Sequence, residues 1–263
     1  MYSPEDEIEF HNGERLYLGV TLIDEGGIKE HLERYEFAKK YIMPGAVVVD
    51  AACGTGYGSN ALADVAGKVI GLEISDHALS WANKNYAANK TNLEFKKTDL
   101  NNIVDLPSSF CDVVISFETL EHITNQQNAL AEFRRILKPG GALIISSPDR
   151  EVITDKAHTE NRFHINELNK REFANLLKNY FMVENLYGQM RFETFPWYKC
   201  LIKRLAKLDV FGVRNFIRNT PSIRFMVSKS FAQIKYEPMT QISVDSQDNF
   251  CIIVAVCRKT QEI

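Results

Sequence analysis

The sequence lacks any apolar run long enough to cross a bilayer as a helix. Its longest apolar stretches, such as CIIVAVC at 251–257, are far shorter than the roughly 20 residues that a membrane-spanning helix needs. The first residues, MYSPEDEIEF, are acidic and contain no apolar segment of the kind that secretory signals carry. We therefore expect a cytoplasmic protein.

Cysteine is scarce, and its spacing shows no pairing. The five cysteines among 263 residues form neither a disulfide framework nor a zinc-binding pattern, which favours a reduced compartment. Cys53 lies in a glycine-rich stretch, with no histidine nearby in the sequence to activate a thiolate. We interpret Cys53 as a small residue that fills a tight turn rather than as a nucleophile.

The chain also lacks a strong overall charge, although its charges are unevenly distributed. Residues 191–235 carry ten Lys and Arg against two Asp and Glu, a net charge of +8, whereas the whole chain carries −3. The rest of the chain is therefore acidic, at −11, and it contains no nucleic-acid recognition motif. We expect no nucleic-acid partner.

Apolar runs typical of strands alternate with amphipathic stretches typical of helices. This alternation predicts an α/β fold with a largely parallel sheet and helices on both faces. The stretch 138–141, KPGG, is predicted as a turn, and Asn166 as the cap of the last helix. The predicted helices are 28–43, 57–66, 76–88, 125–137 and 167–179, and the predicted strands are 46–50, 68–72, 93–96, 112–117, 142–147, 181–187 and 250–257.

A glycine-rich loop and several acids follow successive predicted strands. The loop belongs to VVVDAACGTGYGS at 47–59, in which Asp50 closes the strand, and Glu73, Asp99 and Glu118 lie at or just after the next three strand ends. Ligands of open α/β sheets bind beyond the carboxyl ends of the strands, where an acid after the second strand can accept both ribose hydroxyls. The acid after the third strand could accept an adenine amino group, so the sequence indicates an adenosine compound.

The loop does not match the phosphate-binding patterns. A dinucleotide-binding loop would have a third glycine at 59, which is Ser59, and a P-loop would contain Gly-Lys-Ser or Gly-Lys-Thr, which is absent. Asp50 is a poor neighbour for a pyrophosphate but a good one for an ammonium or a sulfonium. S-adenosyl-L-methionine is therefore the predicted cofactor, with S-adenosyl-L-homocysteine as its product.

Five stretches resemble the class I S-adenosylmethionine-dependent methyltransferases: VVVDAACGTGYGS, VIGLEIS, KKTDL, CDVVISFETLEHI and FRRILKPGGALIISSPD. HLERYEFAKKYI and NRFHINEL further resemble a bacterial branch of sugar and cell-surface glycan methyltransferases. The resemblance implies a Rossmann-like sheet of seven strands, the last one antiparallel. It also implies cofactor contacts at Asp50, Ala51, Cys53, Gly54, Gly56, Glu73, Ile74, Asp99, Leu100 and Glu118.

Histidines after the fourth and fifth strands are candidates for the removal of a proton from an acceptor hydroxyl. We rank His164 first as contact or general base, His122 second and His158 third. The structural alternatives are a helix-entry residue packed on Phe163 for His164 and a helix-start residue for His122. Because the cofactor accounts for the acids at the strand ends, we predict no metal.

The chain is expected to divide into a core with two accessory segments. The arm 1–27 would cover the cofactor pocket, 28–188 would form the Rossmann-like core, 189–249 a basic helical lid, and 250–263 the final core strand. The lid could pack on the core, bind a phosphate-bearing acceptor, or lie on an anionic membrane. Acceptor contacts are predicted at Tyr17, Arg162, Arg191 and Trp197.

We expect O-methylation of a sugar or cell-surface glycan intermediate, which makes a small molecule or glycan the acceptor. Two alternatives stay open at this point. One is methylation of another small metabolite at oxygen or nitrogen, and the other is a regulator that binds the cofactor without catalysis. Peripheral contact with the inner face of a membrane, through the basic segment, and the oligomeric state also stay open.

Overall fold

The computed structural model describes residues 15, 25–103, 105–156, 161–193 and 233–260. Tyr17, His158 and Trp197 lie outside these residues, as do most of the arm 1–27 and most of the basic segment. The predictions for these residues therefore stay predictions.

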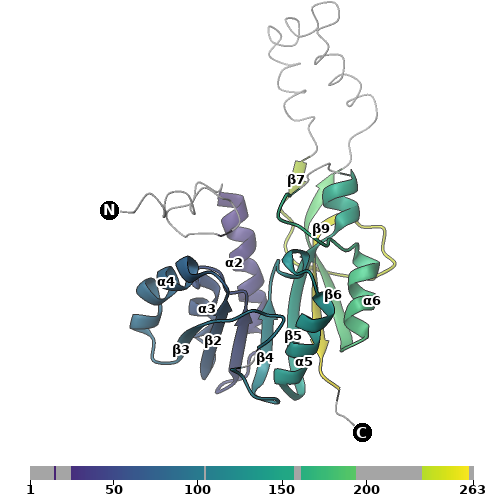
Figure 1. Cartoon of the computed structure of the whole chain (residues 1–263). Coiled ribbons are helices and arrows are strands. Elements are labelled where there is room, and N and C mark those ends of the chain that lie inside the picture. The colour runs from purple at the N-terminus through teal and green to yellow at the C-terminus, as the bar shows by residue number, and fades with distance from the viewer. Residues whose placement is uncertain (1–14, 16–24, 104, 157–160, 194–232, 261–263) are drawn as a thin grey trace, which may run out of the picture.

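One sheet of nine strands forms the centre of the described part, in the order β3-β2-β1-β4-β5-β9-β6-β7, with β8 also paired to β6 (Figure 1). β1 to β5 run parallel, and β9 lies antiparallel between β5 and β6. The seven predicted strands and the antiparallel last strand are thus confirmed. The strands are β1 Val47–Ala51, β2 Lys68–Glu73, β3 Leu93–Lys97, β4 Cys111–Ser116, β5 Leu137–Pro148, β6 Met182–Glu193, β7 Gln233–Lys235, β8 Thr240–Ile242 and β9 Phe250–Arg258.

Two short strands, β7 and β8, were not predicted. Each has only three residues and hydrogen-bonds along β6, which extends to Glu193, beyond the predicted end at 187. Such short edge strands contain too few residues for a periodic pattern. They lie within 189–249, so this part of the expected lid extends the sheet.

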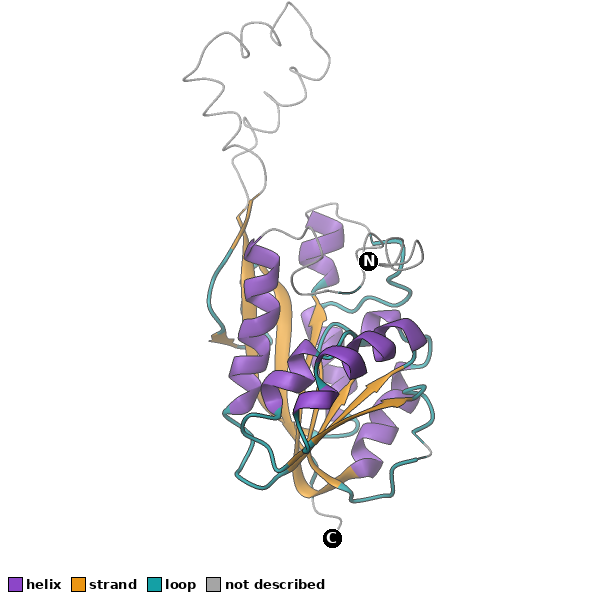
Figure 2. Ribbon diagram, turned by 90° about the vertical axis from the view of Figure 1, so that its left-hand side faces the viewer, coloured by secondary structure: helices purple, strands orange, loops and turns teal. Residues whose placement is uncertain are grey.

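Helices cover both faces of the sheet (Figure 2), which explains why the central strands β1, β2 and β4 are buried along most of their length. Val49, Val114 and Ile145 pack with α5 and α6 on one face, while Val48 and Ile144 pack with α2 and α3 on the other. The helices are α2 Glu25–Lys39, α3 Tyr57–Leu62, α4 Asp76–Asn85, α5 Gln126–Ile136 and α6 Lys170–Lys178, with short turns η1 Ala87–Asn89, η2 Leu120–His122 and η3 Glu151–Lys156.

Two local predictions need correction. The KPGG stretch lies inside β5, but it interrupts the pairing with β4, which passes from Leu137 directly to Ala142. The predicted cap Asn166 was wrong, because α6 begins after Asn169, whose side chain accepts from the Glu172 N–H while Glu172 accepts from the Asn169 N–H. This reciprocal capping box satisfies two helix-end donors and sets the start three residues later.

Among the described residues, the helices are all too short or too polar to cross a membrane. The longest described α-helix, α2, has 15 residues, and its sequence EGGIKEHLERYEFAK contains seven charged residues.

Gly58 provides a test of the packing beneath the loop. A Cβ at Gly58 would lie 1.9 Å from the Cζ of Tyr35, so Gly58→Ala should displace the Tyr35 ring and lower the free energy of unfolding by about 1–3 kcal/mol. Urea unfolding measures this change. Asn60→Ala, at a less buried position of the same helix, is the control and should change stability by less than about 0.5 kcal/mol. Equal stability of the two variants would contradict the packing described.

Candidate functional site

A cavity of about 350 Å³ opens at the carboxyl ends of the central parallel strands. Its walls come from the glycine loop after β1, from the ends of β2 and β4, from residues 98–101 after β3, and from α2. This is the position at which open α/β sheets bind ligands, and the volume is within the range of small-molecule sites.

The glycine loop returns the chain sharply from β1 into α3. The Cys53 N–H donates to Leu72 O at 2.9 Å, which ties the loop to β2, and the Gly56 N–H donates to Cys53 O at 3.1 Å. Gly56 has a φ of 85°, and a Cβ there would lie 2.6 Å from the Phe95 ring. Both the left-handed backbone and the close packing therefore require glycine at this position.

Asp50 lies fully buried at the base of this loop. Its carboxylate accepts from Ser59 Oγ at 2.6 Å and from the Tyr35 hydroxyl at 3.3 Å. Burial raises the pKa of Asp50 to about 7, against the lowering effect of these two hydrogen bonds. A cation bound above the loop would stabilise the ionised carboxylate.

Glu73, at the end of β2, connects three parts of the site. Its carboxylate accepts from the backbone N–H groups of Gly54, Ile74 and Ser75 at 2.9 to 3.1 Å, and it forms an ion pair with Arg15 at 3.0 Å. Arg15 is the one described residue of the arm before α2, and it lines the cavity. The glycine loop and Arg15 thus meet at one buried carboxylate.

Seven of the ten predicted cofactor positions line the cavity: Cys53, Gly54, Glu73, Ile74, Asp99, Leu100 and Glu118. The other three, Asp50, Ala51 and Gly56, are buried behind its wall in β1 and at the start of α3. Asp99 is exposed at the rim, whereas Glu118 is held at a φ of 50° by hydrogen bonds with Ser146 of 2.6 and 3.0 Å.

An aromatic wall from α2 was missed by the sequence argument. The Tyr35 ring packs edge-on against Tyr57 and Phe117, with centroids 5.6 and 5.2 Å apart. His31 also lines the cavity and bonds through Nδ1 to the Tyr57 hydroxyl at 3.1 Å. Burial, together with the Arg34 charge, lowers the pKa of His31 to about 3, so the ring is neutral. His31 was not among the ranked histidines, which follow the fourth and fifth strands, although the stretch HLERYEFAKKYI contains both His31 and Tyr35.

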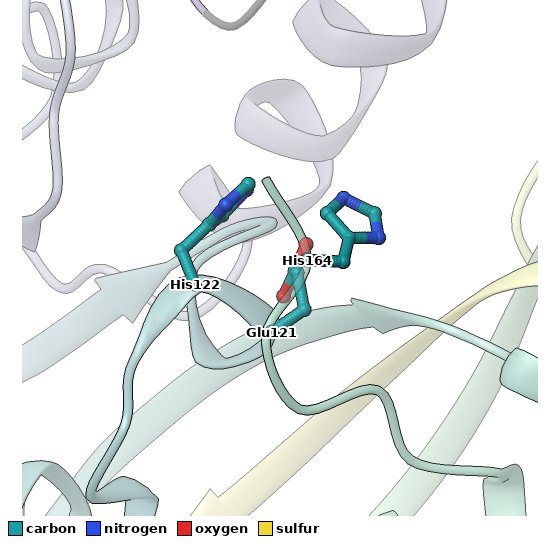
Figure 3. Close-up of side chains that lie close together, drawn as sticks. All are labelled: Glu121, His122 and His164. Carbon is teal, nitrogen blue, oxygen red and sulfur yellow. The ribbon is translucent and has the colours of Figure 1, made fainter. Parts of the chain in front are cut away.

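His122 and His164 lie side by side, with ring centroids 4.9 Å apart and planes at 82° (Figure 3). His122 lines the cavity, and its Nδ1 is 3.1 Å from Phe163 O. His164 lines an adjoining polar pocket of about 600 Å³, and its Nδ1 is 2.5 Å from Glu167 Oε1. The structure therefore brings together the first two ranked histidines, from segments about 40 residues apart.

The predicted acceptor arginines lie in different places. Arg162 lines the polar pocket beside His164 and stacks over Phe163, with its guanidinium carbon 4.5 Å from the ring centroid. Arg191 lines neither this pocket nor the cavity. On β6, it pairs instead with Glu237 at 3.5 Å and with Asp248 at 3.4 Å.

Residues 49–145 match the sequence model of a family described as a methyltransferase domain. This stretch includes the glycine loop and all four strand-end acids. Over residues 49–145 the chain is thus similar to methyltransferase domains. A curated relative is named as an S-adenosylmethionine-dependent methyltransferase, and S-adenosyl-L-methionine is also the cofactor predicted from the loop.

Curated relatives share part of this methyltransferase domain. A probable S-adenosylmethionine-dependent methyltransferase of Mycolicibacterium smegmatis is 34% identical over 146 residues, which are 55% of this chain and 55% of the relative. A ubiquinone biosynthesis O-methyltransferase of Hahella chejuensis is 28% identical over 41% of this chain and 45% of its own length. The chain thus spans about half the length of the curated relatives it matches.

Solved structures share the fold of the methyltransferase domain. The YcgJ protein of Bacillus subtilis matches with a TM-score of 0.59 at 13% identity, over 88% of this chain and 100% of that chain. An S-adenosylmethionine-dependent methyltransferase of Methanosarcina mazei matches with a TM-score of 0.54 at 16% identity, over 86% and 98% of the two chains. At these identities the likeness concerns the fold alone.

The buried acid beneath the loop predicts a specific pH dependence of stability. The pKa of Asp50 is raised from 3.8 to about 7 on folding, so the folded protein holds a proton that the unfolded chain releases between these pH values. The contribution of Asp50 to stability therefore falls as pH rises through this window. Relative to the wild type, Asp50→Asn should become progressively more stable from pH 4 to pH 7, and the difference should then level off.

Urea unfolding at a series of pH values measures this difference. Asp64→Asn is the control, because the ion pair with Lys90 lowers the pKa of the exposed Asp64, and its much smaller pH effect should have the opposite sign. A pH-independent difference for Asp50→Asn would show that Asp50 is ionised throughout.

Proposed function

We propose that this protein transfers a methyl group from S-adenosyl-L-methionine to a hydroxyl of a small polar acceptor, with a sugar or cell-surface glycan intermediate as the acceptor class. One observation carries the proposal. The cavity gathers the carboxylates of Glu73, Asp99 and Glu118 with Asp50 buried behind them, and no lysine is among its described lining residues. Such a set suits a cationic nucleoside rather than a pyrophosphate.

The residues present fit this cofactor. Glu73 is positioned to accept ribose hydroxyls, Asp99 at the rim to accept from the adenine amino group, and the loop above Asp50 to hold the methionine part. Bound S-adenosyl-L-methionine supplies a methyl group on a sulfonium, whose leaving group is a neutral thioether. The remaining task of the protein is to align the acceptor with the methyl carbon and to exclude water.

A hydroxyl acceptor must also lose its proton as its oxygen bonds to the methyl carbon and the carbon–sulfur bond breaks. We assign the handling of this proton to the histidine pair. His122 lies at the cavity wall, and His164 is oriented by Glu167, which in turn accepts from Thr154 Oγ1 at 2.5 Å. A histidine oriented by a carboxylate is the usual arrangement of a general base.

The polar pocket beside the histidines is the proposed acceptor site. Its lining offers both donors and acceptors for a polyhydroxyl compound, and its two arginines suit a phosphate-bearing or acidic one. The ubiquinone biosynthesis O-methyltransferase among the relatives supports transfer to oxygen. The lining residues are Arg150, Thr154, Asn161, Arg162, His164, Ile165, Asn166 and Glu167.

The cofactor assignment predicts a ligand preference. S-adenosyl-L-methionine and S-adenosyl-L-homocysteine should bind in isothermal titration calorimetry, whereas NADH and ATP should not. Glu73→Gln should weaken S-adenosyl-L-methionine binding by about 10-fold or more, because hydrogen bonds to a charged group contribute about 1.5–3 kcal/mol. Glu94→Gln, on the half-exposed edge strand β3, is the matched control and should bind normally. Preference for NADH or ATP would refute the assignment.

The histidine assignment predicts a separation of turnover from binding. His164→Ala should lower the release of S-adenosyl-L-homocysteine with an active acceptor by roughly 100-fold or more, with the affinity for S-adenosyl-L-methionine nearly unchanged. The acceptor is sought among nucleotide sugars and glycan extracts. His77→Ala, on α4 away from the cavity, is the control.

Undiminished turnover in His164→Ala would remove His164 from the mechanism. Tight cofactor binding without product release across sugar, glycan and other small-metabolite acceptors would instead favour a protein that binds the cofactor without catalysis.

A further inference from the structure

We propose that Glu121, His122 and His164 form a binding site for a divalent first-row transition-metal ion, with Zn²⁺ as the representative ion. One potential ligand atom from each residue lies within 4.8 Å of those of the other two. In the view of Figure 3, the Glu121 side chain points up toward the two imidazole rings. The catalytic role of this metal site rests on the proposed function, whereas metal binding by the three residues does not.

The donor set points to this class of metal. Imidazole nitrogens favour zinc, iron, nickel and copper over magnesium and calcium. Two histidines with one glutamate give three protein ligands and leave a coordination position open, which is the pattern of catalytic rather than structural zinc sites.

Both histidines are held in the tautomer that a metal ligand requires. The Nδ1 of His122 faces the carbonyl oxygen of Phe163 at 3.1 Å, and a carbonyl can only accept, so Nδ1 carries the proton and Nε2 the lone pair. The Nδ1 of His164 is 2.5 Å from the Glu167 carboxylate, which gives the same tautomer. Metal-binding histidines commonly donate their other ring N–H to a carbonyl or a carboxylate in this way.

Asn161 supports this assignment independently. Its amide nitrogen lies 2.9 Å from His164 Nε2, so the amide donates to a lone pair there. Asn161 lies on the exposed rim of the polar pocket. We expect this amide to withdraw when His164 Nε2 binds a metal.

Glu121 contributes the buried charge that a cation would neutralise. The residue is 1% exposed, and its Oε1 has no hydrogen-bond partner among the described residues. Its Oε2 only reaches Ser147 Oγ, at 3.5 Å. A buried carboxylate with an unsatisfied oxygen is unfavourable unless it pairs or coordinates a metal.

The backbone holds the two ligand-bearing segments together. Glu121 O accepts from the N–H groups of Ile165 and Asn166 at 2.8 and 3.1 Å. Tetrahedral zinc would bring the ligand atoms to about 3.3 Å from one another, given metal–ligand distances of about 2.0–2.1 Å. Side-chain rotations on this fixed backbone can bring the ligand atoms from within 4.8 Å of one another to that separation.

The location gives the ion a role. His122 lines the cofactor cavity and His164 the polar pocket, so a bound ion would lie at their boundary. An acceptor hydroxyl coordinated there would have a lowered pKa and would lose its proton near neutral pH. With both Nε2 lone pairs coordinated, the histidines would hold the ion in place, and the released proton would pass to solvent water.

The test uses the full chain after treatment with a chelator and desalting. Zn²⁺ is titrated by isothermal calorimetry against a competing chelator, with no cofactor or acceptor present. We expect one tight site per chain, weakened at least about 100-fold in Glu121→Gln, His122→Ala and His164→Ala. His77→Ala and Glu94→Gln are the matched controls and should bind Zn²⁺ as the wild type does.

If a variant fails to fold, electron paramagnetic resonance of the wild-type chain can still identify the metal ligands. Cu²⁺ bound in place of Zn²⁺ should show two imidazole ligands in electron spin echo modulation. Absence of a tight Zn²⁺ site, retention of that site in all three folded variants, or fewer than two imidazoles on Cu²⁺ would overturn the proposal.

The two proposals fail separately. Titration of the metal-free chain with S-adenosyl-L-methionine tests the cofactor site without the metal. Zn²⁺ binding without cofactor binding would overturn the proposed function and support the metal site. Cofactor binding and chelator-insensitive methyl transfer, together with no Zn²⁺ binding, would overturn the metal site alone.

Discussion

Asp50 is the penultimate residue of β1, in the middle of the sheet. Its buried carboxylate joins three elements, because it accepts hydrogen bonds from Ser59 on α3 and from Tyr35 on α2. These contacts fix the position of the glycine loop and of the aromatic wall above it. A buried carboxylate is costly in the absence of compensating charge, and burial accordingly raises the pKa of Asp50. Binding of a cationic ligand above the loop would therefore stabilise the ionised form of the Asp50 carboxylate.

Other carboxylates near the cavity also differ in how their charge is compensated. Glu73 satisfies the loop amides, Glu118 is fixed by Ser146, and Glu121 keeps one oxygen without a hydrogen-bond partner. Carboxylates gathered in one region repel one another unless cations intervene. The methyl donor supplies one such cation, and the proposed metal would supply another at the acceptor side.

Much of this arrangement could be predicted from the sequence, because the strands buried on both faces read as apolar runs and the glycine loop has local requirements. Tyr35 and His31 reach the cavity through the packing of α2 on α3, which periodicity alone does not reveal. The prediction of no metal rested on the acids at the strand ends, whereas the approach of Glu121 to His164 depends on a backbone contact across about 40 residues. The start of α6 was misplaced because Asn166 and Asn169 are both good caps, and only the Glu172 side chain distinguishes them.

The place of β9 has a consequence for the order of assembly. Within the described residues, β6 joins the main body of the sheet only through β9, which lies more than 55 residues later in the chain. While the chain is being synthesised, the parallel strands can pair first, and β5 then presents an open edge until residues 250–258 emerge. β9 thus completes the sheet by inserting between β5 and β6. A chain that stops before β9 would leave the edge of β5 exposed and prone to aggregation.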